Sequence, residues 1–118
     1  MKIYIEANIG AGKTTFINKL KKKLENNNRY SFILEPIEEW KNKYKNNEGK
    51  NILDLFYNNI SRWCYTFQMT AWMTRIKNIE EEIKKNPNNL FFIERSIYTD
   101  KNCFAELCYQ NKLMGKIE

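Results

Sequence analysis

The sequence has 118 residues, 42% of them hydrophobic, and a formal net charge of +6, which together are typical of one globular domain. It contains no histidine, which excludes histidine-based general bases, Ser-His-Asp triads and most zinc sites. No apolar run is long enough to span a membrane. The lysines are dispersed apart from residues 21–23, so we expect no dedicated nucleic-acid surface.

The three cysteines, Cys64, Cys103 and Cys108, show no C-x-x-C spacing and cannot all pair within the chain. Free thiols are typical of a reducing compartment, and we expect a cytoplasmic location. The first expected strand begins at residue 2 or 3, which leaves no room for a signal or transit peptide ahead of it.

The first predicted strand, Ile3-Tyr4-Ile5, runs into a glycine-containing turn and then into a basic helix. This order is typical of a phosphate-binding loop, in which backbone N–H groups and the positive end of the helix bind a polyphosphate. We expect Lys13 to contact the outer phosphates and the Thr14 hydroxyl to bind Mg²⁺. The usual pattern has glycine at the first position, where this chain has an alanine. The predicted loop comprises Ala7, Asn8, Ile9, Gly10, Ala11, Gly12, Lys13, Thr14 and Thr15.

Residues 13–26 are predicted to be helical because apolar side chains recur there at helical spacing. A strand is expected at residues 30–34, and Pro36 ends it because proline disfavours continuation. The polar stretch at residues 41–51 predicts a loop or a short helix exposed to solvent.

A long helical pattern covers residues 52–85, with a predicted break at Asn58-Asn59 and Ser61 as a possible N-cap. One side of it, which we expect to pack on the sheet, carries Ile60, Trp63, Phe67 and Thr74. A neighbouring row contains Gln68, Ala71 and Arg75. The simplest interpretation of such a polar row is a solvated face, and a binding face is the alternative.

The apolar run Leu90–Ile93 is typical of a strand buried within a parallel sheet, and residues 97–114 are predicted to form a further helix. Because strand and helix alternate, the sequence predicts an α/β fold with parallel strands and flanking helices. Ligands of such sheets bind beyond the carboxyl ends of the strands. Glu35, Glu94 and Arg95 leave these ends, as the phosphate loop does, and we expect them to converge.

The converging residues carry the groups that phosphoryl transfer needs. Lys13 and Mg²⁺ would act on the donor phosphates, and Arg95 would neutralise charge on the transferred group. One carboxylate would accept the proton of the attacking hydroxyl while the other helps to hold hydrated Mg²⁺. The residues leave open whether Glu35 or Glu94 is the proton acceptor.

Several ordered blocks resemble the deoxynucleoside kinases, the group that includes deoxycytidine, deoxyguanosine and mitochondrial thymidine kinases. The blocks extend from Ile3 to about Leu113 and read IEANIGAGKTTF, LEPIEEW, LFYNNISRWCYTFQ, TRI and IERSIYTDKNCFAE. The resemblance implies a phosphate-loop kinase fold over residues 1–118 as a single domain. It also implies phosphorylation of a deoxynucleoside at its 5′-hydroxyl, with ATP or another nucleoside triphosphate as donor and Mg²⁺ as cofactor.

For the reacting end of the nucleoside, the resemblance implies roles for three residues. Glu35 matches the carboxylate close to the 5′-hydroxyl. Glu94 and Arg95 match a Glu-Arg-Ser motif, in which the glutamate is commonly given the role of proton acceptor and the arginine contacts the 5′ end.

For the sugar and base, the resemblance implies contacts from four further residues. Trp40 matches an aromatic residue beside the sugar and base, and Tyr57 matches the tyrosine that bonds the 3′-hydroxyl and favours deoxyribose. Phe67 would stack on the base, and Gln68 would pair with the base edge through its amide donor and acceptor.

A choice of substrate follows from Arg75 and Asp100, which match a pair found in family members that act on cytosine and purine deoxynucleosides. Ala71, beside them, is small. A buried carboxylate accepts hydrogen bonds and so favours a base with an exocyclic amino group. We therefore expect deoxycytidine or a purine deoxynucleoside to be preferred over thymidine.

Family members are about twice as long as this chain, so the resemblance implies an N-terminal portion that is truncated before the arginine-bearing lid. By analogy the 90–93 strand lies between the other two, which leaves the 3–5 strand with an open apolar edge. The family is commonly dimeric through long helices, which implies a homodimer.

Two other functions stay open. One is a truncated, non-catalytic relative that binds nucleotide or a partner chain. The other, a phosphate-loop kinase acting on a nucleotide monophosphate, is disfavoured by Gln68 and Tyr57, which suit an uncharged nucleoside.

Overall fold

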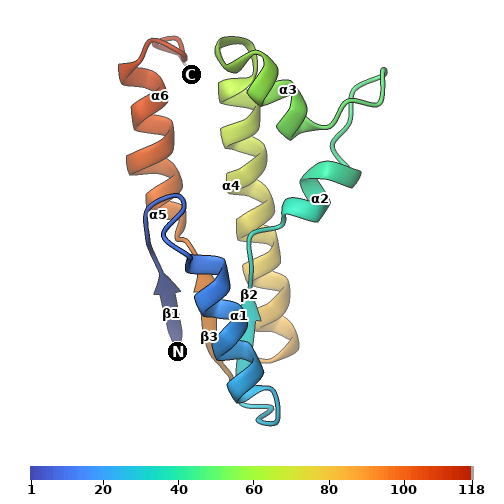
Figure 1. Cartoon of the computed structure of the whole chain (residues 1–118), viewed down its shortest axis with the longest axis vertical. Helices are drawn as coiled ribbons and strands as arrows, with labels where there is room; N and C mark the ends of the chain where they lie inside the picture. Colours follow the sequence, from blue (N-terminus) through green and yellow to red (C-terminus); the bar gives the residue numbers. More distant parts are fainter. Residues whose placement is uncertain (118) are drawn as a thin grey trace. The chain divides into compact units, whose positions relative to one another are not determined.

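The computed structural model describes residues 1–117. In chain order (Figure 1), its elements are β1 (Lys2–Ile5), α1 (Lys13–Leu24), β2 (Tyr30–Ile33), α2 (Ile37–Asn42), α3 (Ile52–Asn58), α4 (Ile60–Lys85), β3 (Leu90–Glu94), α5 (Ile97–Thr99), the π-helix η1 (Asp100–Ala105) and α6 (Glu106–Gln110). They form two compact units. The first comprises Met1–Glu35 and Arg75–Ser96, and the second comprises Pro36–Thr74 and Ile97–Glu118. Helix α4 contributes residues to both units. That the chain acts as a single domain stays a prediction.

The first unit contains a three-stranded parallel sheet in the order β1–β3–β2. Figure 1 shows β3 between its two neighbours, as predicted. Ile5 of β1 is paired with Glu94 of β3, and Ile33 of β2 is paired with Ile93. Because parallel strands end at the same edge, the chain leaves β1, β2 and β3 at one common edge of the sheet.

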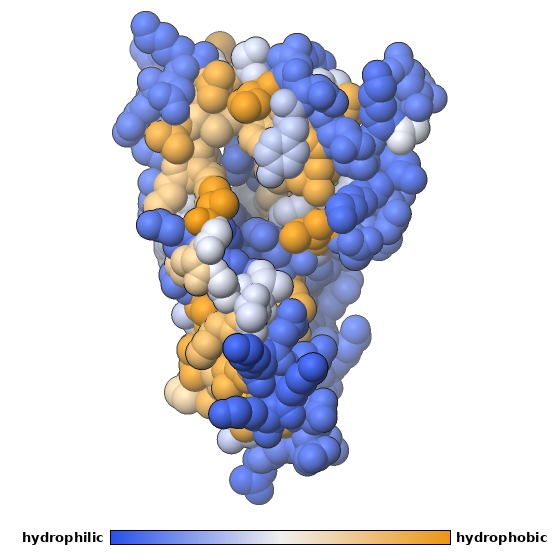
Figure 2. All heavy atoms as spheres, viewed as in Figure 1, coloured by the Kyte–Doolittle hydropathy of each residue, from blue (hydrophilic) through white to orange (hydrophobic). Residues whose placement is uncertain are grey.

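The core of this unit lies on both faces of the sheet. Phe91 and Ile93, two positions apart on the same face of β3, pack with Ile33 and with Ile79 of α4. Helix α1 packs on the strands, and its Ile17 is fully buried. The lysines in its last turn are exposed, and Figure 2 shows hydrophilic residues over this helix.

Within residues 1–117, strand β1 pairs with β3 alone, so its outer edge is open, as expected. Ile3 and Tyr4 on this strand are each more than a third exposed, and Figure 2 shows hydrophobic residues along it. An open apolar edge offers unpaired backbone groups to another strand.

The second unit is built from helices and contains its own hydrophobic cluster. Trp40 of α2, Ile52 of α3 and Ala71 of α4 form the cluster, and Trp63 and Phe67 pack against it. The prediction that Trp63 and Phe67 pack on the sheet is therefore wrong, because α2 and α3 supply their packing partners. The residues of α4 that pack on the sheet lie further along, at Ile79 and Ile83.

The predicted break in the long helix is confirmed, but its cap is not the expected residue. Asn59 separates α3 from α4, and its side-chain oxygen accepts a hydrogen bond from the backbone N–H of Arg62 at 3.2 Å. Ser61 donates its hydroxyl to the same oxygen at 3.1 Å. Asn59 is thus the N-cap of α4, and Ser61 supports it.

The predicted helix over residues 97–114 is three consecutive segments and ends earlier, at Gln110. Lys112 adopts a left-handed backbone conformation with φ of 58°, which a continuing helix cannot accommodate. The N–H of Leu113 then donates to the Cys108 carbonyl at 2.9 Å and closes the turn. None of the helices in residues 1–117 combines the length and the hydropathy that crossing a bilayer requires.

Candidate functional site

The loop between β1 and α1 is the glycine-containing turn that the sequence predicts, and its binding of phosphate stays a prediction. Gly10 and Gly12 adopt left-handed conformations with φ of 80° and 78°, which side chains rarely tolerate. The Ala11 N–H donates to the Asn8 carbonyl at 3.2 Å and closes the turn. Ala7 does not have a positive φ, so its alanine needs no glycine conformation.

A cavity of about 320 Å³ opens over this loop. Ala7 and Ala11 belong to the loop but do not line the cavity. Its lining residues come from the loop, from the end of β2 and from the end of β3, and they are Asn8, Ile9, Gly10, Gly12, Lys13, Thr14, Thr15, Glu35 and Arg95. The structure therefore brings Lys13, Glu35 and Arg95 to one cavity, as the order of strands leads us to expect.

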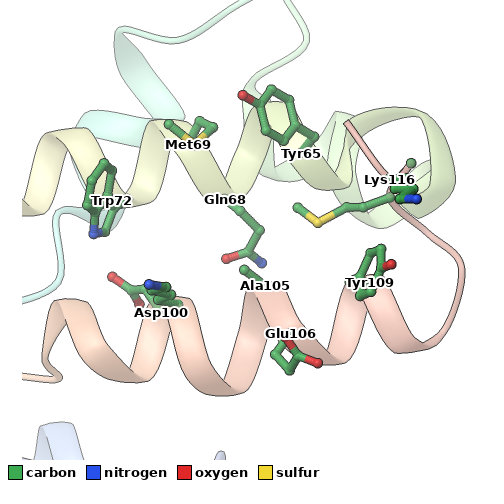
Figure 3. Close-up of a pocket in the computed structure, with 12 residues that line it drawn as sticks. Tyr65, Gln68, Met69, Trp72, Asp100, Ala105, Glu106, Tyr109 and Lys116 are labelled. Atoms are coloured by element: carbon green, nitrogen blue, oxygen red, sulfur yellow. The ribbon is translucent and has the colours of Figure 1, made fainter. Parts of the chain in front are cut away.

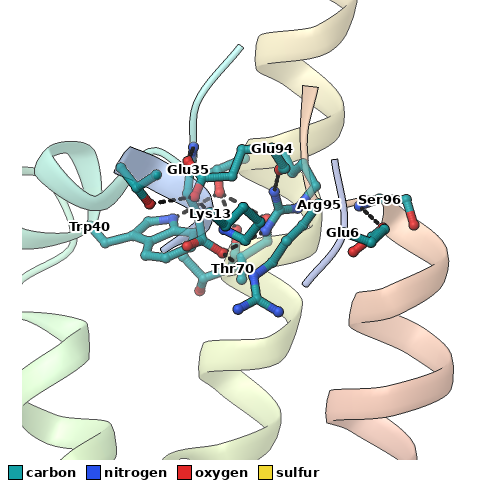
Figure 4. Close-up of polar contacts among 12 residues, drawn as sticks. Glu6, Lys13, Glu35, Trp40, Thr70, Glu94, Arg95 and Ser96 are labelled. Atoms are coloured by element: carbon teal, nitrogen blue, oxygen red, sulfur yellow. Dashed lines mark hydrogen bonds and ion pairs between the residues drawn. The ribbon is translucent and has the colours of Figure 1, made fainter. Parts of the chain in front are cut away.

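Glu94, the last residue of β3, is the central carboxylate beside this cavity and is only 3% exposed (Figure 4). Its Oε1 accepts hydrogen bonds from Lys13 Nζ and, at 2.7 Å, from Thr14 Oγ1. Its Oε2 accepts from the backbone N–H of Glu35 at 3.2 Å. Burial alone would raise the pKa of the Glu94 carboxyl, but these three donors and the Lys13 charge outweigh it and lower the pKa below its ordinary value.

Glu35 is paired with two arginines. Arg75 Nη2 donates to Glu35 Oε1 at 2.9 Å, and Arg95 Nε lies 3.7 Å from the same oxygen. Arg75 Nη1 also donates to the Glu94 carbonyl at 2.7 Å. One buried guanidinium therefore joins the Glu35 side chain to the backbone at the end of β3.

Arg95 has a left-handed backbone with φ of 62°, an unusual conformation for a residue other than glycine. Hydrogen bonds on both sides hold it there. The Arg95 N–H donates to the Ile5 carbonyl at 3.1 Å, and the Ser96 N–H donates to Glu6 Oε1 at 2.7 Å (Figure 4). This turn ends β3 and directs the Arg95 side chain to the cavity.

The polar row on α4 is not the solvated face that its spacing suggests. Ala71 and Arg75 are 5% and 3% exposed, and Gln68 is half-buried. Helical spacing identified the row, but it could not identify Glu35 as a partner of Arg75, because the two residues are 40 positions apart. Asp100 and Arg75 belong to different units, so their expected pairing stays a prediction.

In the second unit, Gln68 and Asp100 line a cavity of about 340 Å³ (Figure 3). The Gln68 side chain points from α4 toward Ala105 at the end of η1. Asp100, on the first turn of η1, is buried. Most of the other lining residues are apolar or aromatic, including Tyr65, Met69, Trp72, Tyr109 and Met114.

The remaining residues predicted to contact a nucleoside lie elsewhere in this unit. Trp40 and Phe67 pack edge to face with ring centres 5.4 Å apart, and Trp40 Nε1 donates to the Thr74 hydroxyl at 2.9 Å. Tyr57 is 72% exposed on α3, and its ring packs beside that of Phe56. Their predicted roles stay predictions.

The residues beside the loop fit a magnesium ion. The Thr14 hydroxyl and the Glu94 carboxylate are hard oxygen donors 2.7 Å apart, on the side of the cavity where Lys13 lies. Mg²⁺ prefers such donors and commonly takes one or two of them from the protein, with phosphate oxygens and water completing the shell.

The sequence is similar to known proteins over most of its length. The sequence model of the family described as "Deoxynucleoside kinase" matches residues 3–118. The chain is 43% identical to the "Probable deoxycytidine kinase" of Fowlpox virus (strain NVSL), over 88% of this chain and 39% of that protein. It is 35% identical to deoxycytidine kinase 1 of Xenopus laevis, over 99% of this chain and 49% of the relative. It is 29% identical to the mitochondrial deoxyguanosine kinase of Xenopus laevis, over 99% of this chain and 48% of the relative.

Proposed function

Because this chain belongs to the deoxynucleoside kinase family, we propose that it acts in the transfer of a phosphoryl group from a nucleoside triphosphate to the 5′-hydroxyl of a deoxynucleoside. The chain spans about half the length, or less, of the curated relatives it matches. The observation that carries the proposal is the single cavity lined by the phosphate loop, Glu35 and Arg95. It supports a donor phosphate and an acceptor hydroxyl at one place.

In this proposal the loop and Lys13 bind the donor phosphates. The Gly10 and Gly12 backbone, the α1 N-terminus and the Lys13 ammonium supply positive charge to them. Thr14 and Glu94 would hold Mg²⁺, which when bound neutralises charge on the phosphate oxygens. Arg95 stabilises the charge that develops on the transferred group.

We assign the role of proton acceptor to Glu35 rather than Glu94. Glu94 is held ionised by three hydrogen-bond donors, and its lowered pKa makes it a weak base. The Glu35 side chain is 21% exposed and lines the cavity, so an acceptor hydroxyl can reach it. The two arginines beside it fix the direction of its carboxylate.

For the base, we assign recognition to Gln68 and Asp100. An amide and a buried carboxylate together suit a base edge with an exocyclic amino group, as in cytosine, adenine and guanine. The relatives are named deoxycytidine and deoxyguanosine kinases, which agrees with that choice. Deoxycytidine or a purine deoxynucleoside is therefore the proposed substrate, ahead of thymidine.

The test is to incubate the purified chain with ATP, Mg²⁺ and each of deoxycytidine, deoxyguanosine, deoxyadenosine and thymidine. Mass spectrometry then detects the deoxynucleoside monophosphate. Lys13→Met should lower the rate by about a hundredfold or more. Lys77→Met removes an exposed lysine from α4 and should leave the rate unchanged.

Three outcomes decide between the functions. Product from the wild-type chain that is lost in Lys13→Met supports the kinase. ATP binding without product from any nucleoside supports the alternative of a non-catalytic nucleotide-binding protein. A preference for thymidine would contradict the assignment of Gln68 and Asp100.

A further inference from the structure

One oxygen of Glu94 engages both side chains that a triphosphate and its metal would need. Lys13 Nζ and Thr14 Oγ1 donate to the same Oε1. Lys13 and Glu94 are both buried, with side chains 7% and 3% exposed. The Lys13–Glu94 contact lies beside the cavity over the phosphate loop.

A free triphosphate competes with Glu94 for the N–H donors of Lys13, and binding the ammonium fully draws it away from the carboxylate. The Glu94 carboxylate would then stay buried, without its main counter-charge, beside several added negative charges. Removing one partner of a buried ion pair is costly because the remaining charge is uncompensated. The other cations of this cluster do not relieve the cost, since Arg75 and Arg95 pair with Glu35.

A triphosphate that binds together with Mg²⁺ does not leave Glu94 without a counter-charge. The hard oxygen donors Thr14 and Glu94 suit Mg²⁺, and the dication would replace the Lys13 ammonium as the counter-charge of Glu94. Lys13 is then available to the phosphates. In this exchange both Glu94 and Lys13 keep a partner of opposite charge.

We propose, on the basis of the proposed function, that Glu94 is a specificity-determining residue for the donor. By holding Lys13, it makes the loop select the magnesium complex of a triphosphate over the free anion. The contacts of Glu94 with the Thr14 hydroxyl and the Glu35 N–H keep the carboxylate in place while Lys13 exchanges partners.

The experiment measures binding by calorimetry and needs no turnover. Inorganic tripolyphosphate is titrated into the 118-residue chain in EDTA and, separately, with Mg²⁺ in excess. For the wild-type chain, Mg²⁺ should tighten binding by about tenfold or more, the factor expected when a charge-assisted hydrogen bond must otherwise be lost.

Glu94→Gln keeps the shape and one acceptor oxygen, which can still accept from the Thr14 hydroxyl, but removes the charge that holds Lys13. Its metal-free affinity should rise by about tenfold, and its dependence on Mg²⁺ should nearly vanish. The matched control is Glu80→Gln, which makes the same change of charge at an exposed position of α4 outside the cavity lining. Its affinity should change by no more than about twofold in either buffer.

Thr14→Val provides a second variant that keeps the Glu94 charge. Tripolyphosphate in EDTA should bind it as weakly as it binds the wild type, while the gain from Mg²⁺ should shrink because one oxygen donor is lost. This comparison, with the wild-type measurement, tests the proposal even if Glu94→Gln does not fold.

The outcomes separate this inference from the proposed function. Equal binding of free and magnesium-bound tripolyphosphate by the wild-type chain overturns the selectivity but leaves the donor site intact. Weaker or unchanged metal-free binding by Glu94→Gln also overturns it. Failure of the wild-type chain to bind either form counts against both the selectivity and the donor site.

Discussion

The Arg75 guanidinium donates a hydrogen bond of 2.9 Å to Glu35, 40 positions earlier in the chain, and a second of 2.7 Å to the Glu94 carbonyl. These contacts tie α4 to the ends of β2 and β3. Arg75 is 3% exposed, so its charge depends on them.

Replacing Arg75 with methionine should therefore destabilise the chain. The change removes the hydrogen bonds of Arg75 to the partly buried Glu35 carboxylate and to the Glu94 carbonyl, and the expected loss is about 2–3 kcal/mol of unfolding free energy. Urea unfolding followed by circular dichroism measures it. Lys77→Met, two residues further on the exposed side of α4, should change the unfolding free energy by less than about 0.5 kcal/mol. Equal stability of the two variants would contradict the role of Arg75.

The lowered pKa of Glu94 predicts a loss of stability in acid. Because folding lowers this pKa, the unfolded chain takes up the proton at higher pH than the folded chain does. The contribution of Glu94 is fully present above the ordinary glutamate pKa of 4.5 and disappears as pH falls through the lower pKa of the folded state.

Glu94→Gln should reduce the slope with which the unfolding free energy falls in acid. Unfolding free energies from about pH 6 to about pH 3, measured without divalent metal, give the comparison. Glu80→Gln, at an exposed position of α4, should keep the wild-type slope. An unchanged slope in Glu94→Gln would show that Glu94 is not held ionised.

Two glycines have nearly the same backbone conformation, so replacing each in turn separates an effect on stability from an effect on phosphate binding. Gly10 in the phosphate loop has φ of 80°, and Gly49, between α2 and α3, has φ of 79°. A Cβ built on either glycine meets no atom within 4 Å. Alanine at either position should therefore cost about 1–2 kcal/mol, from backbone strain alone.

Only Gly10→Ala should also weaken tripolyphosphate binding, because Gly10 lines the cavity and Gly49 does not. Thermal unfolding and calorimetry on both variants provide the test. A similar loss of affinity in Gly49→Ala would mean that the weakening reports lower stability rather than a changed loop.

The N-cap of α4 gives a prediction about helix stability. Asn59→Ala removes the acceptor of the Arg62 N–H and should cost about 1 kcal/mol. Ser61→Ala removes only a side-chain contact to Asn59 and should cost less than about 0.5 kcal/mol. The reverse order of these losses in urea unfolding would make Ser61 the cap.

Local sequence patterns were sufficient to predict the strands and the turn between β1 and α1. Gly10, Gly12 and Lys13 follow an apolar strand, and parallel strands end at one edge, so the meeting of Lys13, Glu35 and Arg95 could be predicted from their order along the chain. The same reasoning could not find the partners of Arg75, because side-chain pairing across 40 positions depends on packing rather than on spacing.

The helices were harder to predict where packing partners determine which face is buried, or where a backbone turn determines the last residue. Trp63 and Phe67 have the spacing of a sheet-facing stripe, yet Trp40 and Ile52 from α2 and α3 cover them. The end of α6 depends on the left-handed backbone of Lys112, and lysine has no strong preference that announces such a turn.

Glu35 and Glu94 are joined twice, once from the Glu35 N–H to the Glu94 carboxylate and once from the Glu35 carboxylate through Arg75 to the Glu94 carbonyl. Thermodynamic coupling between the two acids follows from this double link, so their single replacements will not act independently. A double-mutant cycle on Glu35 and Glu94, with and without Mg²⁺, is therefore the measurement that apportions catalysis between them.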